Sequence, residues 1–354
     1  MKFAARPWIV ALILGLLGLS PGTAHAGMTP EEVKAFEGYN ALAEKGDRVA
    51  QNNLGVCYNN GFGVAKDYVQ AVSWYRKAVE QGYATAQFNL GVCYAEGEGV
   101  AKDQAQAVSW YRKAAEQGYV NAISNLGNSY FNGLGVAKDQ VQAVSWFRKA
   151  AEQGLASAQF NLGLCYDKGE GVTKDQVQAV SWYRKAADKG DASAQTNLGF
   201  CYDKGEGVVK DQVQAVSWFR KAAEQGYADA QFNLGNSYRK GEGVAKDQVQ
   251  AVSWYRKAAE QGNVNAISNL GVCYDIGFGV AKDEIEAYAY YNLAGITDDI
   301  ARENLANLEK KMSPDARLLG QQRTKQLQKE IEGSLESAGD LLKAIEKENL
   351  RKGI

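Results

Sequence analysis

Residues 86–118 read AQFNLGVCYAEGEGVAKDQAQAVSWYRKAAEQG, and this stretch recurs along the chain at a fixed interval of 36 residues. The interval aligns nearly every position from Asn53 to Ala294. One position carries tyrosine in every copy, and another carries tryptophan in six copies and Tyr290 in the seventh. Regular periods of about 20–50 residues are typical of stacked supersecondary units. The 354 residues therefore predict seven tandem repeats, where length alone would allow two separate domains.

Each copy is predicted to fold as two helices joined by a glycine-rich turn. In the quoted copy, the second helix is expected to begin after Asp103, a favourable N-cap, with Gln106 three residues on as in a capping box. Gly118 suits the left-handed position just beyond its end. Between these residues, apolar side chains recur at i, i+3, i+4 and i+7, which is one face of a helix. Arg112 and Glu116 are expected to form a solvated pair on the other side.

The first helix of the quoted copy is predicted over residues 86–94. In six copies, the position before it carries a side chain that can accept a bond from a free N–H at a helix start. The residues at this expected cap position are Thr85, Asn121, Ser157, Ser193, Asp229 and Asn265. Gly91 is unfavourable inside a helix, so its recurrence indicates a close crossing of the partner helix.

The two ends of the array are predicted to be helical as well. We expect a leading helix within residues 27–46, the seven repeats over 47–294, and capping helices and a tail over 295–354. Ser313 and Pro314 suit the N-cap and first position of the last helix. That segment carries Leu327, Ile331 and Leu335 at i, i+4 and i+8. Two glycines, Gly333 and Gly339, should interrupt a sustained heptad pattern, which favours docking on the last repeat or a loose tail over a coiled coil.

The first 26 residues have the pattern of a secretory signal peptide. Lys2 and Arg6 precede an apolar run over residues 8–19, and residues 24–26 read AHA. The run is shorter than the ~20 residues of a membrane-spanning helix, and no second run follows. We therefore expect cleavage after Ala26, a periplasmic or secreted protein, and no membrane span.

Cleavage would remove His25, the only histidine, together with two of the 40 basic residues, leaving 38 against 41 acidic ones. A net charge near −3 argues against binding to nucleic acid. The loss of histidine excludes Ser–His and Cys–His nucleophile pairs and the commonest neutral metal ligand. No phosphate-binding loop, zinc-protease or hydrolase motif occurs in the sequence. We predict no enzymatic activity, no catalytic residue, no cofactor and no metal.

The five cysteines occupy one repeat position, where the two remaining copies carry Ser129 and Ser237. They are Cys57, Cys93, Cys165, Cys201 and Cys273. Stacked helices lie 8–10 Å apart, beyond the Cα separation that a disulfide spans. We expect packed thiols without disulfide bonds. A mixed disulfide with a partner stays open, because the number is odd.

The recurring aromatic residues are interpreted mainly as packing residues. Each tryptophan shares a helical face with alanines, and the next position alternates between tyrosine and phenylalanine, as in Tyr111 and Phe147. The tyrosine exemplified by Tyr94 never loses its hydroxyl, which we expect to bond a nearby backbone group. A ligand-stacking role for either series is the alternative.

The combined pattern L-G-x-x-Y-x-x-G-x-G-V-x-K-D and A-x-x-W-Y-R-K-A-A-x-x-G resembles the Sel1-like repeat, a relative of the tetratricopeptide repeat. The resemblance covers residues 47–294. It implies a right-handed α/α superhelix that serves as an adaptor in protein complexes, often in the bacterial envelope, without chemistry of its own. Cysteine-rich bacterial Sel1-like proteins are similar but carry two cysteines per repeat, and the second is missing here.

Positions that differ among otherwise similar copies are the candidate binding positions. Two such series lie near the end of the first helix and in the following turn, where an exposed apolar side chain needs cover or a partner. The candidates for partner binding are Phe62, Phe131, Leu134, Asp167, Asp203, Arg239 and Phe278. The acidic members alternate with Lys168 and Lys204, so a solvated face is the expected interpretation of that stretch.

Three functional hypotheses follow. The first is an exported, non-catalytic scaffold whose groove binds a protein, a peptide or a component of the cell envelope. The second is a module that binds or hydrolyses cell-wall polymers such as peptidoglycan through paired carboxylates. The third is a structural protein that forms oligomers through its C-terminal helices.

Overall fold

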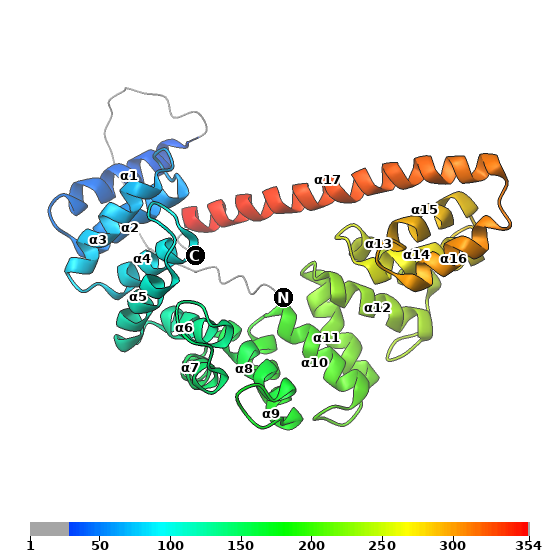
Figure 1. Ribbon diagram of the computed structural model, residues 1–354, viewed down its shortest axis with the longest axis horizontal. Coiled ribbons are helices and arrows are strands. Elements are labelled where there is room, and N and C mark those ends of the chain that lie inside the picture. Colours follow the sequence, from blue (N-terminus) through cyan, green and yellow to red (C-terminus); the bar gives the residue numbers. More distant parts are fainter. Residues whose placement is uncertain (1–27, 353–354) are drawn as a thin grey trace. The chain divides into compact units, whose positions relative to one another are not determined.

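The computed structural model describes residues 28–352, with side chains described up to residue 336 (Figure 1). These residues are helices joined by short turns, and they form two compact units that meet in the chain between Lys174 and Asp175. No helix among them is long and apolar enough to cross a membrane. The predicted signal peptide lies outside the described residues.

The first unit opens with α1 and continues with antiparallel helix pairs. Its helices are α1 (Pro30–Ala43), α2 (Arg48–Asn60), α3 (Tyr68–Glu80), α4 (Ala84–Glu96), α5 (Gln104–Glu116), α6 (Val120–Asn132), α7 (Gln140–Glu152) and α8 (Ala156–Lys168). The predicted leading helix is therefore confirmed.

The second unit continues the same alternation and ends with two further helices. Its helices are α9 (Gln176–Asp188), α10 (Ala192–Lys204), α11 (Gln212–Glu224), α12 (Ala228–Lys240), α13 (Gln248–Ala259), α14 (Val264–Ile276), α15 (Glu284–Ala294), α16 (Asp299–Glu309) and, up to Ile345, α17 (Pro314–Lys352). The all-α fold of 36-residue helix-turn-helix repeats is confirmed, and the hand of the superhelix stays a prediction.

The predicted N-cap is confirmed for the second helix of each repeat and is wrong for the first helix. Asp103 caps α5 by accepting the backbone N–H of Gln106 at 3.0 Å, and the equivalent aspartates cap the other second helices. The predicted caps of the first helices are wrong by two residues: Tyr83 is the N-cap of α4, and Thr85 lies in its first turn. The reason is that the tight turn at Gly82, where the N–H of Tyr83 donates to the carbonyl of Ala78, returns the chain to helical geometry early.

The core of each repeat lies where its two helices cross. A Cβ placed on Gly91 of α4 would lie 2.7 Å from the ring of Tyr111 in α5, and the equivalent glycines meet the equivalent rings. Leu90 and Ala107 are buried beside this contact. The predicted close crossing is confirmed, and it explains why a residue that weakens a helix recurs in the middle of one.

The second glycine of each turn joins one repeat to the preceding one. Gly99 has φ +70°, and a Cβ placed on it would lie 2.1 Å from the carbonyl oxygen of Tyr68, the first residue of α3. The same approach recurs between Gly135 and Gln104, and between Gly207 and Gln176. The turn therefore packs directly on the backbone of the preceding second helix.

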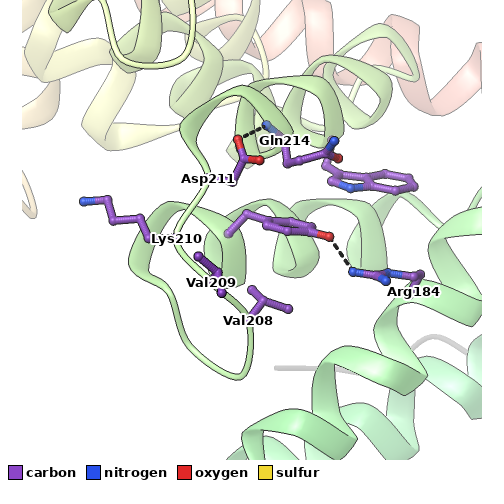
Figure 2. Close-up of a pocket in the computed structure, with 8 residues that line it drawn as sticks. Arg184, Val208, Val209, Lys210, Asp211 and Gln214 are labelled. Carbon is purple, nitrogen blue, oxygen red and sulfur yellow. Dashed lines mark hydrogen bonds between the residues drawn. The ribbon is translucent and has the colours of Figure 1, made fainter.

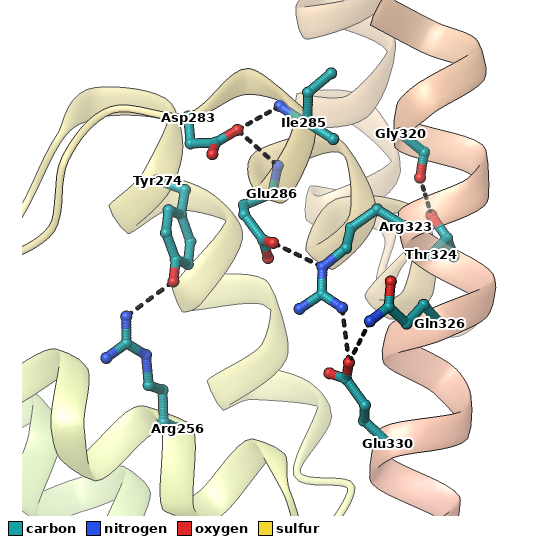
Figure 3. A network of polar contacts seen from close by, with 10 residues as sticks. All are labelled: Arg256, Tyr274, Asp283, Ile285, Glu286, Gly320, Arg323, Thr324, Gln326 and Glu330. Atoms are coloured by element: carbon teal, nitrogen blue, oxygen red, sulfur yellow. Dashed lines mark hydrogen bonds and ion pairs between the residues drawn. The ribbon is translucent and has the colours of Figure 1, made fainter.

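The last helix docks on the last repeat (Figure 3). Arg323 of α17 forms ion pairs with Glu286 of α15 at 2.6 Å and with Glu330 at 2.9 Å. Leu327 and Ile331 are buried in the final hydrophobic cluster. The prediction of docking is confirmed. Helix α17 continues through Gly333 and Gly339, since one glycine costs a helix only about 1 kcal/mol.

Candidate functional site

The thiols are part of the packing between helices. All five cysteines are buried and, within residues 28–352, no disulfide joins them. Burial raises the pKa of Cys57, Cys93 and Cys165 to about 12, and that of Cys273 to about 11. A thiol with such a pKa is protonated at neutral pH and is a poor nucleophile. The prediction of packed thiols is confirmed.

We expect these thiols to resist labelling by a disulfide reagent in the native protein at pH 8. A raised pKa lowers the thiolate fraction, so the labelling rate should rise only as the pH approaches 11–12 or when the chain unfolds. Release of the reagent's chromophore measures the rate, and the protein unfolded in guanidinium is the control. Fast labelling of two or more thiols in the folded state would contradict the burial.

The invariant tyrosine joins adjacent repeats through its hydroxyl. Arg76 of α3 donates from Nη2 to the hydroxyl of Tyr94 at 3.2 Å. The same bond recurs in the pairs Arg112–Tyr130, Arg148–Tyr166, Arg220–Tyr238 and Arg256–Tyr274 at 2.8–3.1 Å, and in Arg184–Tyr202. The expected backbone partner is wrong, as is the expected pairing of Arg112 with Glu116. The arginine and the tyrosine of each pair belong to neighbouring repeats, so the sequence pattern within one copy does not reveal their contact.

Replacing Tyr130 with phenylalanine is expected to destabilise the fold by about 0.5–1 kcal/mol, because one solvent-exposed hydrogen bond to a guanidinium is lost. Chemical denaturation measures the change. Arg112→Ala should add little in the double variant, since the two side chains share one bond. Independent, additive effects would show that the bond contributes nothing.

Four of the six repeat tryptophans form the partly exposed edge of their second helix, whereas Trp74 and Trp218 are buried. Trp110 and Trp146 are half-buried, whereas the next residues, Tyr111 and Phe147, are buried completely. A lysine three residues on covers each indole, with Nζ 3.5–4.3 Å from the ring centroid; the pairs are Lys77–Trp74, Lys113–Trp110, Lys149–Trp146, Lys185–Trp182, Lys221–Trp218 and Lys257–Trp254. The interpretation of tryptophan as core is therefore right only in part. The series gives the repeats a surface of aromatic rings and cations.

A pocket of about 570 Å³ opens between successive repeats of the second unit (Figure 2). Arg184 lines it and donates to Tyr202. Asp211 also lines it, and its carboxylate accepts the backbone N–H groups of Val213 and Gln214 at 3.0 Å. The charges of Arg184 and Asp211 are thus engaged in contacts within the repeats, and Lys210 is the third charged residue of the lining.

Val209 at the mouth of this pocket is a site that the sequence interpretation missed. It is 87% exposed, the highest value among the exposed large hydrophobic side chains. The sequence does distinguish this position, because five other copies carry alanine there and one carries Thr173. An exposed valine in place of alanine adds apolar surface that a partner could cover.

The predicted site residues of the first unit differ in exposure. Phe131 packs against Phe147 with ring centroids 6.3 Å apart, and Phe62 is half-buried. Asp167 is half-buried in the last turn of α8. Leu134, at the turn after α6, is 46% exposed. Of these four residues, Leu134 presents the most accessible apolar side chain.

The predicted site residues of the second unit also differ in their exposure and contacts. Phe278 packs half-buried against the final hydrophobic cluster, so the protein itself covers part of it. Arg239 is exposed at the end of α12, near the hydroxyl of Tyr255, which donates to Asn236 Oδ1 at 2.7 Å. Asp203 is half-buried, and its backbone carbonyl accepts a bond from Gln212. Partner binding by all seven candidates stays a prediction.

The 36-residue repeat with these recurring contacts identifies the family of the chain. Sel1 repeats match residues 48–83, 84–119, 120–155, 156–191, 192–227, 228–263 and 264–295. The chain belongs to the Sel1 repeat family. Sel1 repeats are generally non-catalytic and typically bind proteins.

Solved structures of bacterial proteins are similar to this Sel1 repeat chain. A Sel1 repeat protein from Oxalobacter formigenes is 34% identical over 77% of this chain and 79% of its own, with a TM-score of 0.63. A protective antigen of uropathogenic Escherichia coli strains, which displays an SLR fold, is 34% identical over 87% of this chain and 82% of its own, with a TM-score of 0.42. None of the curated proteins compared matches this chain.

Proposed function

We propose that this Sel1 repeat protein is an exported scaffold that binds a partner protein or peptide along its helical array and catalyses no reaction. One observation carries the proposal: the recurring reactive groups are engaged in contacts within the repeats, whereas some of the side chains that differ between copies are exposed apolar residues. Cys93 is buried, Tyr94 bonds Arg76, and Asp103 caps a helix. Leu134 and Val209, by contrast, are exposed apolar side chains.

The sequence-based expectation of export supports a partner in the periplasm, outside the cell or in the cell envelope. The near-neutral charge supports a protein partner over nucleic acid. Repeat arrays bind through extended surfaces to which several repeats contribute. A partner is therefore expected to contact variable positions in more than one copy.

In-cell crosslinking tests the proposal. A photoreactive amino acid at Leu134, followed by mass spectrometry, should capture one specific protein. The matched control is Glu206, the exposed residue at the same turn position two repeats later. Capture of nothing above background from Leu134, or of the same mixture from both positions, would contradict the proposal.

An activity assay provides the second test. The purified protein is expected to turn over no peptidoglycan, β-lactam or ester substrate. Turnover that Asp167→Asn abolishes would favour the hydrolytic alternative and overturn the non-catalytic part of the proposal.

A further inference from the structure

Two distant segments of the array are almost identical. Residues 114–127 read AAEQGYVNAISNLG and residues 258–271 read AAEQGNVNAISNLG, so only Tyr119 and Asn263 differ. Both segments carry isoleucine, Ile123 and Ile267, at a position where the other five copies carry glutamine: Gln51, Gln87, Gln159, Gln195 and Gln231.

The glutamine usually closes the surface between neighbouring second helices. Gln87 accepts a bond at its Oε1 from Gln117 Nε2 at 2.8 Å. The same 2.8 Å bond joins Gln51 to Gln81, Gln195 to Gln225, and Gln231 to Gln261. Isoleucine has no oxygen to accept this bond, so the polar closure is lost in two copies.

At Ile123 the result is an open pocket of about 540 Å³ within the first unit. Ile123 and Gly118 contribute an apolar floor, and Trp146 forms a wall. Lys149 lies over the indole of Trp146, with Nζ 4.3 Å from the ring centroid. The remaining charged lining is acidic: Glu116 and Glu152, both exposed.

At Ile267 the same surface is covered by the chain's own last helix. Leu335 Cδ1 of α17 lies 4.0 Å from a Cβ placed on Gly262, the equivalent of Gly118. Ile267 shares a buried cluster with Leu327 and Ile331 of α17. A Cβ on Gly118, in contrast, would have no atom within 4 Å. Ile123 and Ile267 are themselves equally buried, at 3% and 4% exposure, so the difference lies in the surface around them. The last helix lies at this surface beside Gly262, whereas the surface beside Gly118 is open.

We propose that the pocket at Ile123 binds an amphipathic helix of a partner protein, with apolar side chains at i, i+4 and i+8 like Leu327, Ile331 and Leu335. The two glutamates on its rim favour a helix whose apolar stripe is flanked by lysine or arginine. The inference rests on the proposed function, because it specifies the partner that the scaffold binds. Helix-in-groove recognition uses the same spacing of apolar anchors.

The test uses the full-length protein and a fluorescein-labelled synthetic peptide of residues 321–338, which carries the stripe together with Lys325 and Lys329. Fluorescence anisotropy should show saturable binding that weakens at high salt. Ile123→Gln should weaken binding tenfold or more while leaving the melting temperature unchanged or higher, since it restores the pairing with Gln153 that other copies make. A peptide with Ile331→Asp is the matched control and should not bind.

A gain of binding completes the design. Gln195→Ile should create a second site beside Trp218 and Lys221, and raise the stoichiometry from one peptide to two. Equal affinity of the wild type and Ile123→Gln would overturn the inference, as would no saturable binding up to roughly millimolar peptide. Self-association of the wild-type protein that Ile123→Gln abolishes would assign the site to a second copy instead and would also overturn it.

The outcomes separate this inference from the proposed function. A partner captured from Leu134, combined with no peptide binding at Ile123, would refute the helix site and leave the scaffold proposal intact. Peptide binding at Ile123 with no protein captured from Leu134 in cells would support the helix site and contradict the scaffold proposal.

Discussion

Replacing Gly99 with alanine is expected to destabilise the fold by about 2–5 kcal/mol. A left-handed backbone costs a residue with a Cβ roughly 1–2 kcal/mol, and the overpacked contact adds about 1–3 kcal/mol. The second cost arises because the new Cβ would lie 2.1 Å from the carbonyl oxygen of Tyr68, a backbone atom that cannot move aside alone. Urea denaturation followed by circular dichroism measures the change.

Gly118→Ala is the matched control in the same repeat. Gly118 has φ +83°, but a Cβ there would meet nothing within 4 Å, so only the conformational cost of roughly 1–2 kcal/mol applies. Equal effects of the two substitutions would show that the turn does not pack against the preceding second helix as described.

Replacing Leu327 with alanine is expected to detach the last helix from the last repeat. Leu327 is 4% exposed and belongs to the final hydrophobic cluster, and a buried leucine truncated to alanine costs about 2–5 kcal/mol. Because α17 lies at the end of the array, the loss should appear as local opening and not as unfolding of the whole chain. Limited proteolysis near Lys325 and Lys329, or hydrogen exchange of α17, measures it.

Leu318→Ala serves as the control for this effect. Leu318 lies on the same helix but is 55% exposed, so its truncation should change protection by less than about 0.5 kcal/mol. Similar protease sensitivity in both variants would mean that the buried stripe does not hold α17 in place.

The structure also clarifies why some sequence-based expectations failed. The period predicted the repeat, the crossing at Gly91 and the aspartate caps correctly, because each depends on neighbours within one copy. The partner of the Tyr94 hydroxyl was missed, because Arg76 belongs to the preceding copy. The half-burial of Trp110 depends on the preceding copy in the same way, because Trp110 packs against a cluster that contains Ala71 and Val72.

The candidate site shows the same division. Phe131 and Phe278 stood out in the sequence because they replace other residues at the end of a first helix and in the following turn, yet packing within the protein covers part of their surface. Ile123 was not selected from the sequence, although it replaces a recurring glutamine. Its significance depends on the last helix, which lies beside Gly262 but leaves the pocket beside Gly118 open, and that difference arises from residues more than 180 positions further along the chain.

The sequence by itself determined the repeat length, the helical class and the family of this protein, because local periodicity and caps encode secondary structure directly. The tertiary structure decided which of the recurring side chains join repeats and which near-identical surface stays open. The physical reason is that a helix pair of this size buries its apolar face only against its neighbours. Exposure is therefore a property of the stack, and two equal stretches of sequence acquire different surfaces according to what packs on them.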